Sequence, residues 1–135
     1  MIRKDYLVKQ FEEFGKVLAK ILTFRNECAA AELELEIKQA VQRFTNLEIE
    51  EVEALELGEF RALILELDDH RLKILADLLF EKMHYYLLAN NDENYLLIKF
   101  KCLQIYEMIR SRAQSDFDMD VYYKLQFLKK EGRKK

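Results

Sequence analysis

The clearest candidate for chemistry in this sequence is a Glu-x-x-His spacing, formed by Glu81 and His84. On a helix this spacing places a carboxylate and an imidazole on one face, as in the ligand pairs of di-iron sites. Such a site needs a second pair and two further glutamates on facing helices. The only other histidine, His70, has Leu67 three residues before it, and it lies roughly 21 Å from His84 along a helix. We therefore expect no metal site, and we expect Asp77, Glu81 and His84 to form the polar face of an amphipathic helix.

A second metal-like pattern begins at Asp116, where aspartates alternate as at the start of a calcium-binding loop. The sixth position of such a loop is glycine and the twelfth is a bidentate glutamate, but these positions hold Val121 and Phe127. The segment can neither make the turn nor close the coordination sphere. We expect Asp118 to cap a helix instead.

No motif for catalysis or cofactor binding is visible in the sequence. With no proline and three glycines, the chain lacks a glycine-rich phosphate loop and a strand–turn–helix nucleophile site. Cys28 and Cys102 match no zinc or redox spacing, and we expect both to be small apolar side chains in a reducing compartment. We predict a protein that is not an enzyme and binds no cofactor; an enzyme of unknown class is the least favoured alternative.

Apolar runs are too short for a membrane helix, which needs about 20 apolar residues. Charged residues from Arg3 to Glu13 also interrupt the region where a secretory signal has its apolar core. These features predict a cytoplasmic protein without membrane contacts.

The scarcity of proline and glycine favours helices, and apolar residues keep helical spacing along nearly the whole chain. We predict an all-α fold, a single-domain antiparallel array of five to seven helices over residues 1–135. Residues 1–44 are expected to form a helix pair, with helices at 5–26 and 27–44, and residues 45–67 to form short acidic helices. Residues 68–130 are expected to form a long hairpin, with helices at 69–89 and 95–113, followed by a terminal helix. Residues 131–135 are expected to be a frayed basic tail.

One segment reads as either strand or helix. Apolar and charged residues alternate strictly from Glu32 to Ile37, as in a half-buried strand. However, the apolar residues from Leu33 to Phe44 keep helical spacing, and no second strand is available to pair with this one. We predict a helix.

Several residues are placed to end or begin helices. Thr45 and Glu48 have the spacing of a capping box, and Gly58 is placed to end the first short helix in a left-handed conformation. Asp68 is expected to cap the long helix that follows. Residues 90–94, rich in asparagine, predict the turn of the hairpin.

The hairpin resembles a degenerate tetratricopeptide unit between Ala76 and Tyr106. The residues that carry the resemblance are Ala76, Leu79, Met83 and Tyr86 on the first helix, Asn91 and Asp92 in the turn, and Leu97, Phe100, Cys102 and Leu103 at packing positions of the second helix. The resemblance implies a helix–turn–helix shape.

The chain also resembles a group of short, uncharacterised bacterial proteins. The shared features are the opening Met-Ile-Arg-x-Asp-Tyr-Leu, the segment Leu18–Leu22, and a TPR-like hairpin followed by a Phe-Asp segment, here Phe117 and Asp118. This resemblance implies an all-helical intracellular protein, and it supplies no catalytic residues.

Charge is distributed unevenly, with a net charge of +3 in 1–26, −10 in 27–69, −1 in 70–98 and +5 in 99–135. This pattern suggests complementarity within the chain, head-to-tail contact between copies, or simply solvated helix faces. The acids from Glu48 to Glu56 form either a site for a basic partner or the wet side of a helix that buries Ile49, Val52 and Leu55. The basic residues from Lys129 to Lys135 make nucleic-acid contact an alternative function, which the acidic overall charge disfavours.

Aromatic residues concentrate in the C-terminal half and suggest a partner-binding surface. Tyrosine suits protein recognition because its ring is apolar and its hydroxyl tolerates water. The candidate residues are Tyr85, Tyr86, Tyr95, Tyr122 and Tyr123, although ordinary core and rim packing would use them as well. We predict a protein–protein interaction or scaffold module that binds a protein, a peptide or a second copy through a groove beside the hairpin or an apolar helix face.

Overall fold

The computed structural model describes residues 2–113 and 118–133 of the chain. These residues form seven helices and no strand, which confirms the all-α prediction and the helical assignment of Glu32–Ile37. The helices are α1 (Ile2–Asn26), α2 (Ala30–Thr45), α3 (Ile49–Ala54), α4 (Leu57–Glu66), α5 (Asp69–Leu88), α6 (Asp92–Ala113) and α7 (Met119–Arg133).

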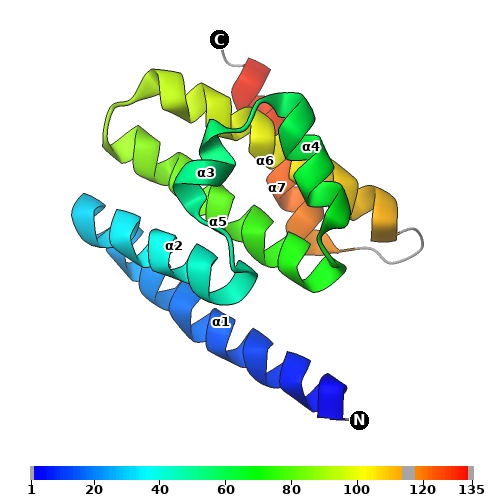
Figure 1. Cartoon of the computed structure of the whole chain (residues 1–135). Coiled ribbons are helices and arrows are strands. Elements are labelled where there is room, and N and C mark those ends of the chain that lie inside the picture. The colour runs from blue at the N-terminus through cyan, green and yellow to red at the C-terminus, as the bar shows by residue number, and fades with distance from the viewer. Residues whose placement is uncertain (1, 114–117, 134–135) are drawn as a thin grey trace.

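Helix α5 lies at the centre of the molecule (Figure 1). The α1–α2 pair packs against α5 mainly through α2, and α6 packs along another side of α5. Helix α7 packs against α6, and the short helix α4 also lies against α6. The buried apolar side chains of these helices form one continuous cluster. None of the helices in the described part of the chain has the length and apolarity needed to cross a bilayer.

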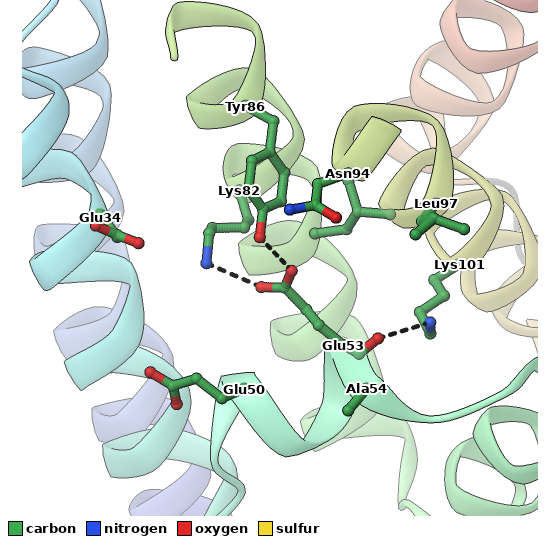
Figure 2. Close-up of a pocket in the computed structure, with 10 residues that line it drawn as sticks. Glu34, Glu50, Glu53, Ala54, Lys82, Tyr86, Asn94, Leu97 and Lys101 are labelled. Carbon is green, nitrogen blue, oxygen red and sulfur yellow. Dashed lines mark hydrogen bonds and ion pairs between the residues drawn. The ribbon is translucent and has the colours of Figure 1, made fainter. Parts of the chain in front are cut away.

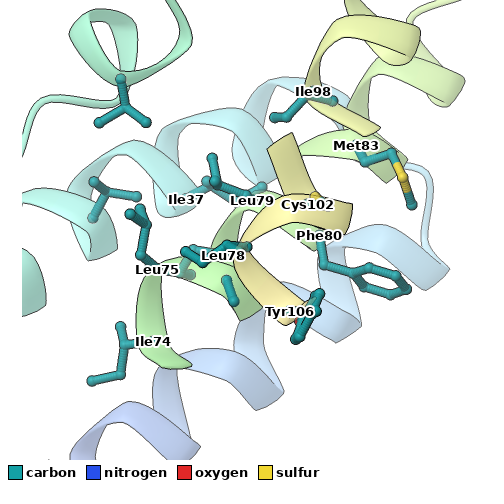
Figure 3. Packing of buried hydrophobic residues seen from close by; sticks show 14 of the residues in the cluster. Ile37, Ile74, Leu75, Leu78, Leu79, Phe80, Met83, Ile98, Cys102 and Tyr106 are labelled. Atoms are coloured by element: carbon teal, nitrogen blue, oxygen red, sulfur yellow. The ribbon is translucent and has the colours of Figure 1, made fainter. Parts of the chain in front are cut away.

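Helix α5 is buried around most of its circumference because other helices contact it on several sides. Its buried residues are Leu72, Ile74, Leu75, Ala76, Asp77, Leu78, Leu79, Phe80, Glu81, Lys82 and Met83. Figure 3 shows α5 side chains packed between Ile37 of α2 and the α6 residues Cys102 and Tyr106. The prediction that Asp77 and Glu81 line a polar face was wrong, since their exposed fractions are 5% and 4%.

Asp77 is the centre of a buried polar network that joins three helices. Its Oδ1 accepts hydrogen bonds from the hydroxyl of Tyr106 on α6 (2.6 Å) and from Lys124 Nζ on α7 (3.0 Å). Its Oδ2 accepts from Lys73 Nζ (3.0 Å), one turn earlier on α5. Both lysines also pair with Asp120 at the start of α7 (3.1 and 3.2 Å). The network therefore fixes α7 against α5.

Two further buried charges of α5 pair with other helices. Glu81 Oε1 accepts from Arg25 Nη1 near the end of α1 at 2.9 Å. Burial raises the pKa of Glu81, and Arg25 opposes that shift. Lys82 Nζ, on a side chain that is also buried, donates to Glu53 Oε2 of α3 at 2.8 Å. Successive charges on α5 thus reach α7, α1 and α3.

Several helix ends differ from the sequence predictions. The Thr45–Glu48 capping box does not form: the Thr45 hydroxyl donates to the Val41 carbonyl at 2.6 Å and ends α2, and Asn46 is left-handed with φ 64°. Gly58 does not cap α3 either. It lies in the first turn of α4, whose capping box is formed by Glu56 and Glu59.

Other caps follow the prediction. Asp68 caps α5 by accepting from the amide of Arg71 at 2.8 Å, and Asp118 caps α7 by accepting from the amides of Asp120 and Val121.

The hairpin turn is shorter than residues 90–94, because Asn91 accepts from the amide of Asn94 and α6 already begins at Asp92. Helix α7 continues to Arg133, so residues 131–133 of the expected tail are helical in the structure. Residues 1, 114–117 and 134–135, including Phe117 of the Phe-Asp segment, lie outside the described residues.

Replacing Asp77 with alanine removes an acceptor shared by three donors. We expect the free energy of unfolding in urea to fall by about 3 kcal/mol, because the variant leaves the lysines and the buried tyrosine short of a partner. Glu13→Ala is the control, since it breaks the exposed pair with Arg43 (2.9 Å) and should change stability by less than about 1 kcal/mol. Equal losses in the two variants would contradict a structural role for the network.

Candidate functional site

A groove with a largely apolar lining lies between α4 and α6. It has a volume of about 420 Å³ and is lined by Arg61, Ile64, Phe100, Leu103, Gln104, Glu107, Met108 and Ser111. Leu57 and Leu65 lie four residues on either side of Arg61 and therefore share its side of α4. We call the groove together with Leu57, Leu65, Leu96 and Leu97 the α4–α6 surface.

Large apolar side chains of the α4–α6 surface are exposed to solvent. The exposed fractions are 52% for Leu96, 54% for Leu97 and 58% for Phe100 on α6, and 44% for Leu57 and 63% for Leu65 on α4. The expectation that Leu97 and Phe100 occupy packing positions of the hairpin was therefore wrong. The core side of α6 is formed by Ile98, Ile105 and Tyr106 together with Cys102, which the sequence did place in a packing position. Helix α6 therefore carries apolar residues on two sides.

Arg112 of α6 holds α4 in place beside the groove. Its guanidinium donates to the backbone carbonyls of Ile64 (3.3 Å), Leu65 (3.1 Å) and Leu67 (2.8 Å), at the C-terminal end of α4. It also pairs with Asp69 at 3.1 Å. A cation is favourable there because the last carbonyls of a helix lack partners and carry partial negative charge. Arg112 therefore helps to fix the position of α4, together with Phe60 and Ile64, which are fully buried in the core.

A more polar pocket of about 340 Å³ lies between α2, α3, α5 and α6 (Figure 2). At its centre the Glu53 carboxylate accepts from Lys82 and from the hydroxyl of Tyr86. Lys101 Nζ donates to the Glu53 carbonyl at 3.1 Å and lies 5.8 Å from the centre of the Phe60 ring. Burial lowers the pKa of Lys101 and raises that of Tyr86.

The polar groups of this pocket already hold α3 in place. Lys101 satisfies a carbonyl at the C-terminal end of α3, while Lys82 and Tyr86 bind the carboxylate of the same Glu53. A six-residue helix needs such contacts, because a helix of that length is not stable alone. The pocket therefore has a structural explanation that involves no ligand.

The five candidate tyrosines are not equally available to a partner. Tyr122 and Tyr123 on α7 are 46% and 64% exposed. Tyr85 and Tyr86 are half-buried, with their rings 5.4 Å apart, and Tyr86 is bonded to Glu53. Tyr95 is 8% exposed and belongs to the core. Of the predicted residues, only the α7 pair is open to solvent.

Most residues of the acidic cluster around α3 are exposed to solvent. Ile49 and Val52 are buried and Leu55 is half-buried, as expected for a short amphipathic helix. Glu50 pairs with Lys38 at 3.1 Å. Glu53 differs from its neighbours because it faces inward to Lys82.

The two histidines lie in separate surroundings. The His84 ring packs against Phe80 and Phe127, and its Nδ1 lies 3.0 Å from the Phe80 carbonyl. The His70 ring contacts Phe11 edge-on at 4.3 Å, and its Nε2 bonds to Gln10 of α1. Within residues 2–113 and 118–133, no group of three or more His, Cys, Asp or Glu side chains is placed to hold a metal ion.

Comparisons of the chain with protein-family models, with curated proteins and with solved structures found no match. The resemblances to tetratricopeptide units and to the bacterial group therefore stay predictions. The candidate surface rests on its geometry alone. One feature of the sequence indicates this surface. Apolar residues lie around most of the first turns of α6, at Leu96, Leu97, Ile98 and Phe100, and a single core contact cannot bury all of them.

Replacing Arg112 with alanine should loosen α4. We expect backbone amides of α4 to exchange with solvent at least several-fold faster, because hydrogen bonds from a charged donor contribute about 1.5–3 kcal/mol. Hydrogen-exchange mass spectrometry of the Leu57–Leu67 region measures this. Arg110→Ala is the matched control, since Arg110 pairs only at the surface with Glu107 on the same helix (2.9 Å). Unchanged exchange in Arg112→Ala would show that α4 is held by other contacts.

The surroundings of His70 predict a pH dependence of stability. Burial lowers the pKa of His70 below 6.5, nearby Arg71 acts in the same direction, and Asp68 partly opposes them. The unfolded chain therefore takes up this proton more readily, and the stability contributed by neutral His70 is lost as the pH falls below about 6.5. We expect the unfolding free energy to decline more steeply between about pH 7 and pH 5 in wild type than in His70→Gln. Parallel curves from urea unfolding would contradict the assignment.

Proposed function

We propose that this chain is a non-catalytic protein–protein interaction module whose α4–α6 surface binds an apolar helix face of a partner. The observation that carries the proposal is the exposure of Leu96, Leu97 and Phe100, each more than half accessible, beside a groove lined by Ile64, Leu103 and Met108. A groove between two helices is a common binding site for an amphipathic helix with anchors at helical spacing.

The exposed residues form a patch of functional size. Five large side chains at about half exposure leave on the order of 500 Å² of apolar surface, since a large side chain buries about 150–250 Å² in full. The largest apolar patch on a monomeric protein is about 300–600 Å² and is often functional. A single aromatic near the centre of such a patch is a typical anchor, and Phe100 holds that position.

The tyrosines of α7 are the alternative binding surface. Tyr122 and Tyr123 are exposed together with Met119, which is 70% accessible. However, no described groove adjoins them. The α4–α6 surface is the better candidate because it combines exposed anchors with a concave wall.

Nucleic-acid contact through the basic ends is less well supported. Several of the bases are engaged within the chain: Arg25 with Glu81, Lys124 with Asp77, and Arg112 with α4. A cation held by a buried carboxylate contributes little to binding a phosphate backbone, which depends on releasing counterions from free charges.

We also propose that the protein acts in the cytoplasm, as a TPR-like member of the bacterial group described above. Both cysteines are free thiols, with Cys28 exposed and Cys102 buried. Unpaired thiols are typical of a reducing compartment.

Replacing Phe100 with aspartate tests the binding surface. The wild-type chain, immobilised and exposed to a lysate of the cells that produce it, should retain a defined set of proteins. We expect Phe100→Asp to lose them, because burying a charge in an apolar interface reduces affinity by 10-fold or more, about 1.4 kcal/mol at least. Quantitative mass spectrometry of the retained proteins measures the difference.

Tyr123→Asp is the matched control, because it places the same charge at a comparably exposed aromatic residue outside the groove. It should retain the partners. If Tyr123→Asp loses them and Phe100→Asp keeps them, the tyrosine surface of α7 is the binding site and the present assignment is wrong. Circular dichroism verifies that both variants stay helical.

A further inference from the structure

The two halves of the α4–α6 surface differ: one carries exposed apolar side chains and the other forms the groove. Along α6, the first half of the surface carries the protruding side chains Leu96, Leu97 and Phe100. The second half forms the groove, where Leu103 and Met108 face Ile64 of α4. A second α6 helix running in the opposite direction would set its protruding half against this groove, and the same contact would recur at the other end.

The charges of α6 favour the same antiparallel arrangement. Its first turn is acidic, with Asp92 and Glu93, and its last turn is basic. Arg112 of that turn is held by α4, so Arg110, which pairs at the surface with Glu107, is the base that a second copy would meet. Glu93, Leu97, Phe100 and Gln104 recur at helical spacing and form one stripe from the acidic end toward the groove. Antiparallel helices would place the acidic turn of one copy beside the basic turn of the other, whereas parallel helices would place like charges together.

We propose that the partner of the α4–α6 surface is a second copy of this chain, packed about a two-fold axis with the two α6 helices antiparallel. The inference rests on the proposed function and names its partner. A two-fold contact uses the same patch on both copies, so the assembly is complete with two chains and leaves no apolar patch exposed for a third.

The area of the surface sets the affinity expected between the two copies. On the order of 500 Å² of apolar area per copy gives about 1,000 Å² for the pair, the lower limit of a specific interface. The interface has few charged hot spots apart from the helix ends, so we expect a dissociation constant on the order of 10–100 µM.

Sedimentation velocity over a range from about 5 µM to about 1 mM tests the proposal, because this range spans the expected dissociation constant. The weight-average mass of wild type should rise from one chain toward two. Phe100→Asp should stay at one chain throughout, and Tyr123→Asp should behave as wild type. A wild-type chain that remains monomeric at about 1 mM overturns the proposal, as does a dimer that Phe100→Asp leaves intact.

A charge-reversal pair tests the orientation of the helices. Glu93→Arg and Arg110→Glu should each weaken the dimer several-fold, because each places like charges at both ends of the antiparallel pair. The double variant should restore the wild-type dissociation constant, since it re-creates opposite charges between copies. Failure of the double variant to recover, with its helical content intact, overturns the antiparallel arrangement.

The experiments distinguish a failure of the dimer proposal from a failure of the proposed function. If wild type is monomeric but still captures a different protein in a manner that depends on Phe100, then self-association is wrong and the interaction surface stands. If neither dimerisation nor capture depends on Phe100, both proposals are wrong.

Discussion

The structure depends on the enclosure of a single charged helix. Asp77, Glu81 and Lys82 of α5 are each about 95% buried, and an ionised group in that position is strongly destabilising unless a partner meets it. The partners come from different helices: Asp77 binds Lys124 of α7, Glu81 binds Arg25 of α1 and Lys82 binds Glu53 of α3. Apolar packing alone tolerates a helix that rotates or slides by a residue, whereas these pairs do not. The buried charges therefore help to fix α1, α3 and α7 around α5.

Helix α6 has the complementary task of positioning the two shortest helices. Lys101 donates to a carbonyl at the end of α3, and Arg112 donates to three carbonyls at the end of α4. Helices of six and ten residues are too short to be stable in isolation, so their positions are set by α6 and by the core beneath them. This places the walls of the groove on one rigid support, and it links the candidate surface directly to the folded core of the hairpin.

The helices themselves could be predicted from the sequence, because apolar spacing and the aspartate caps at 68 and 118 are local signals. The full extent of the buried sides of α5 and α6 could not. The sequence predicts a polar face for Asp77 and Glu81 because charged residues usually face water, yet here helices cover α5 on several sides. Conversely, the tetratricopeptide resemblance places Leu97 and Phe100 in packing positions, although α6 fills its core contact with other residues. Both errors have one physical origin: the number of neighbours around a helix is a property of the whole fold, and periodicity within one helix does not contain it.

The exposed residues of α6 are better explained by binding than by folding. Ile98, Cys102, Ile105 and Tyr106 already give α6 a complete buried side, and each is no more than 2% exposed. Leu96, Leu97 and Phe100 add nothing to that side, while their exposure lowers solubility and invites aggregation. Phe11 of α1 offers a contrast: it is 49% exposed, but its ring rests on His70 and helps join α1 to α5. Leu96, Leu97 and Phe100 are each more than half exposed, although Leu97 also lines the polar pocket beside Glu53. A second helix laid along the groove would bury them, which is why we propose the α4–α6 surface, and not the tyrosines of α7, as the binding site.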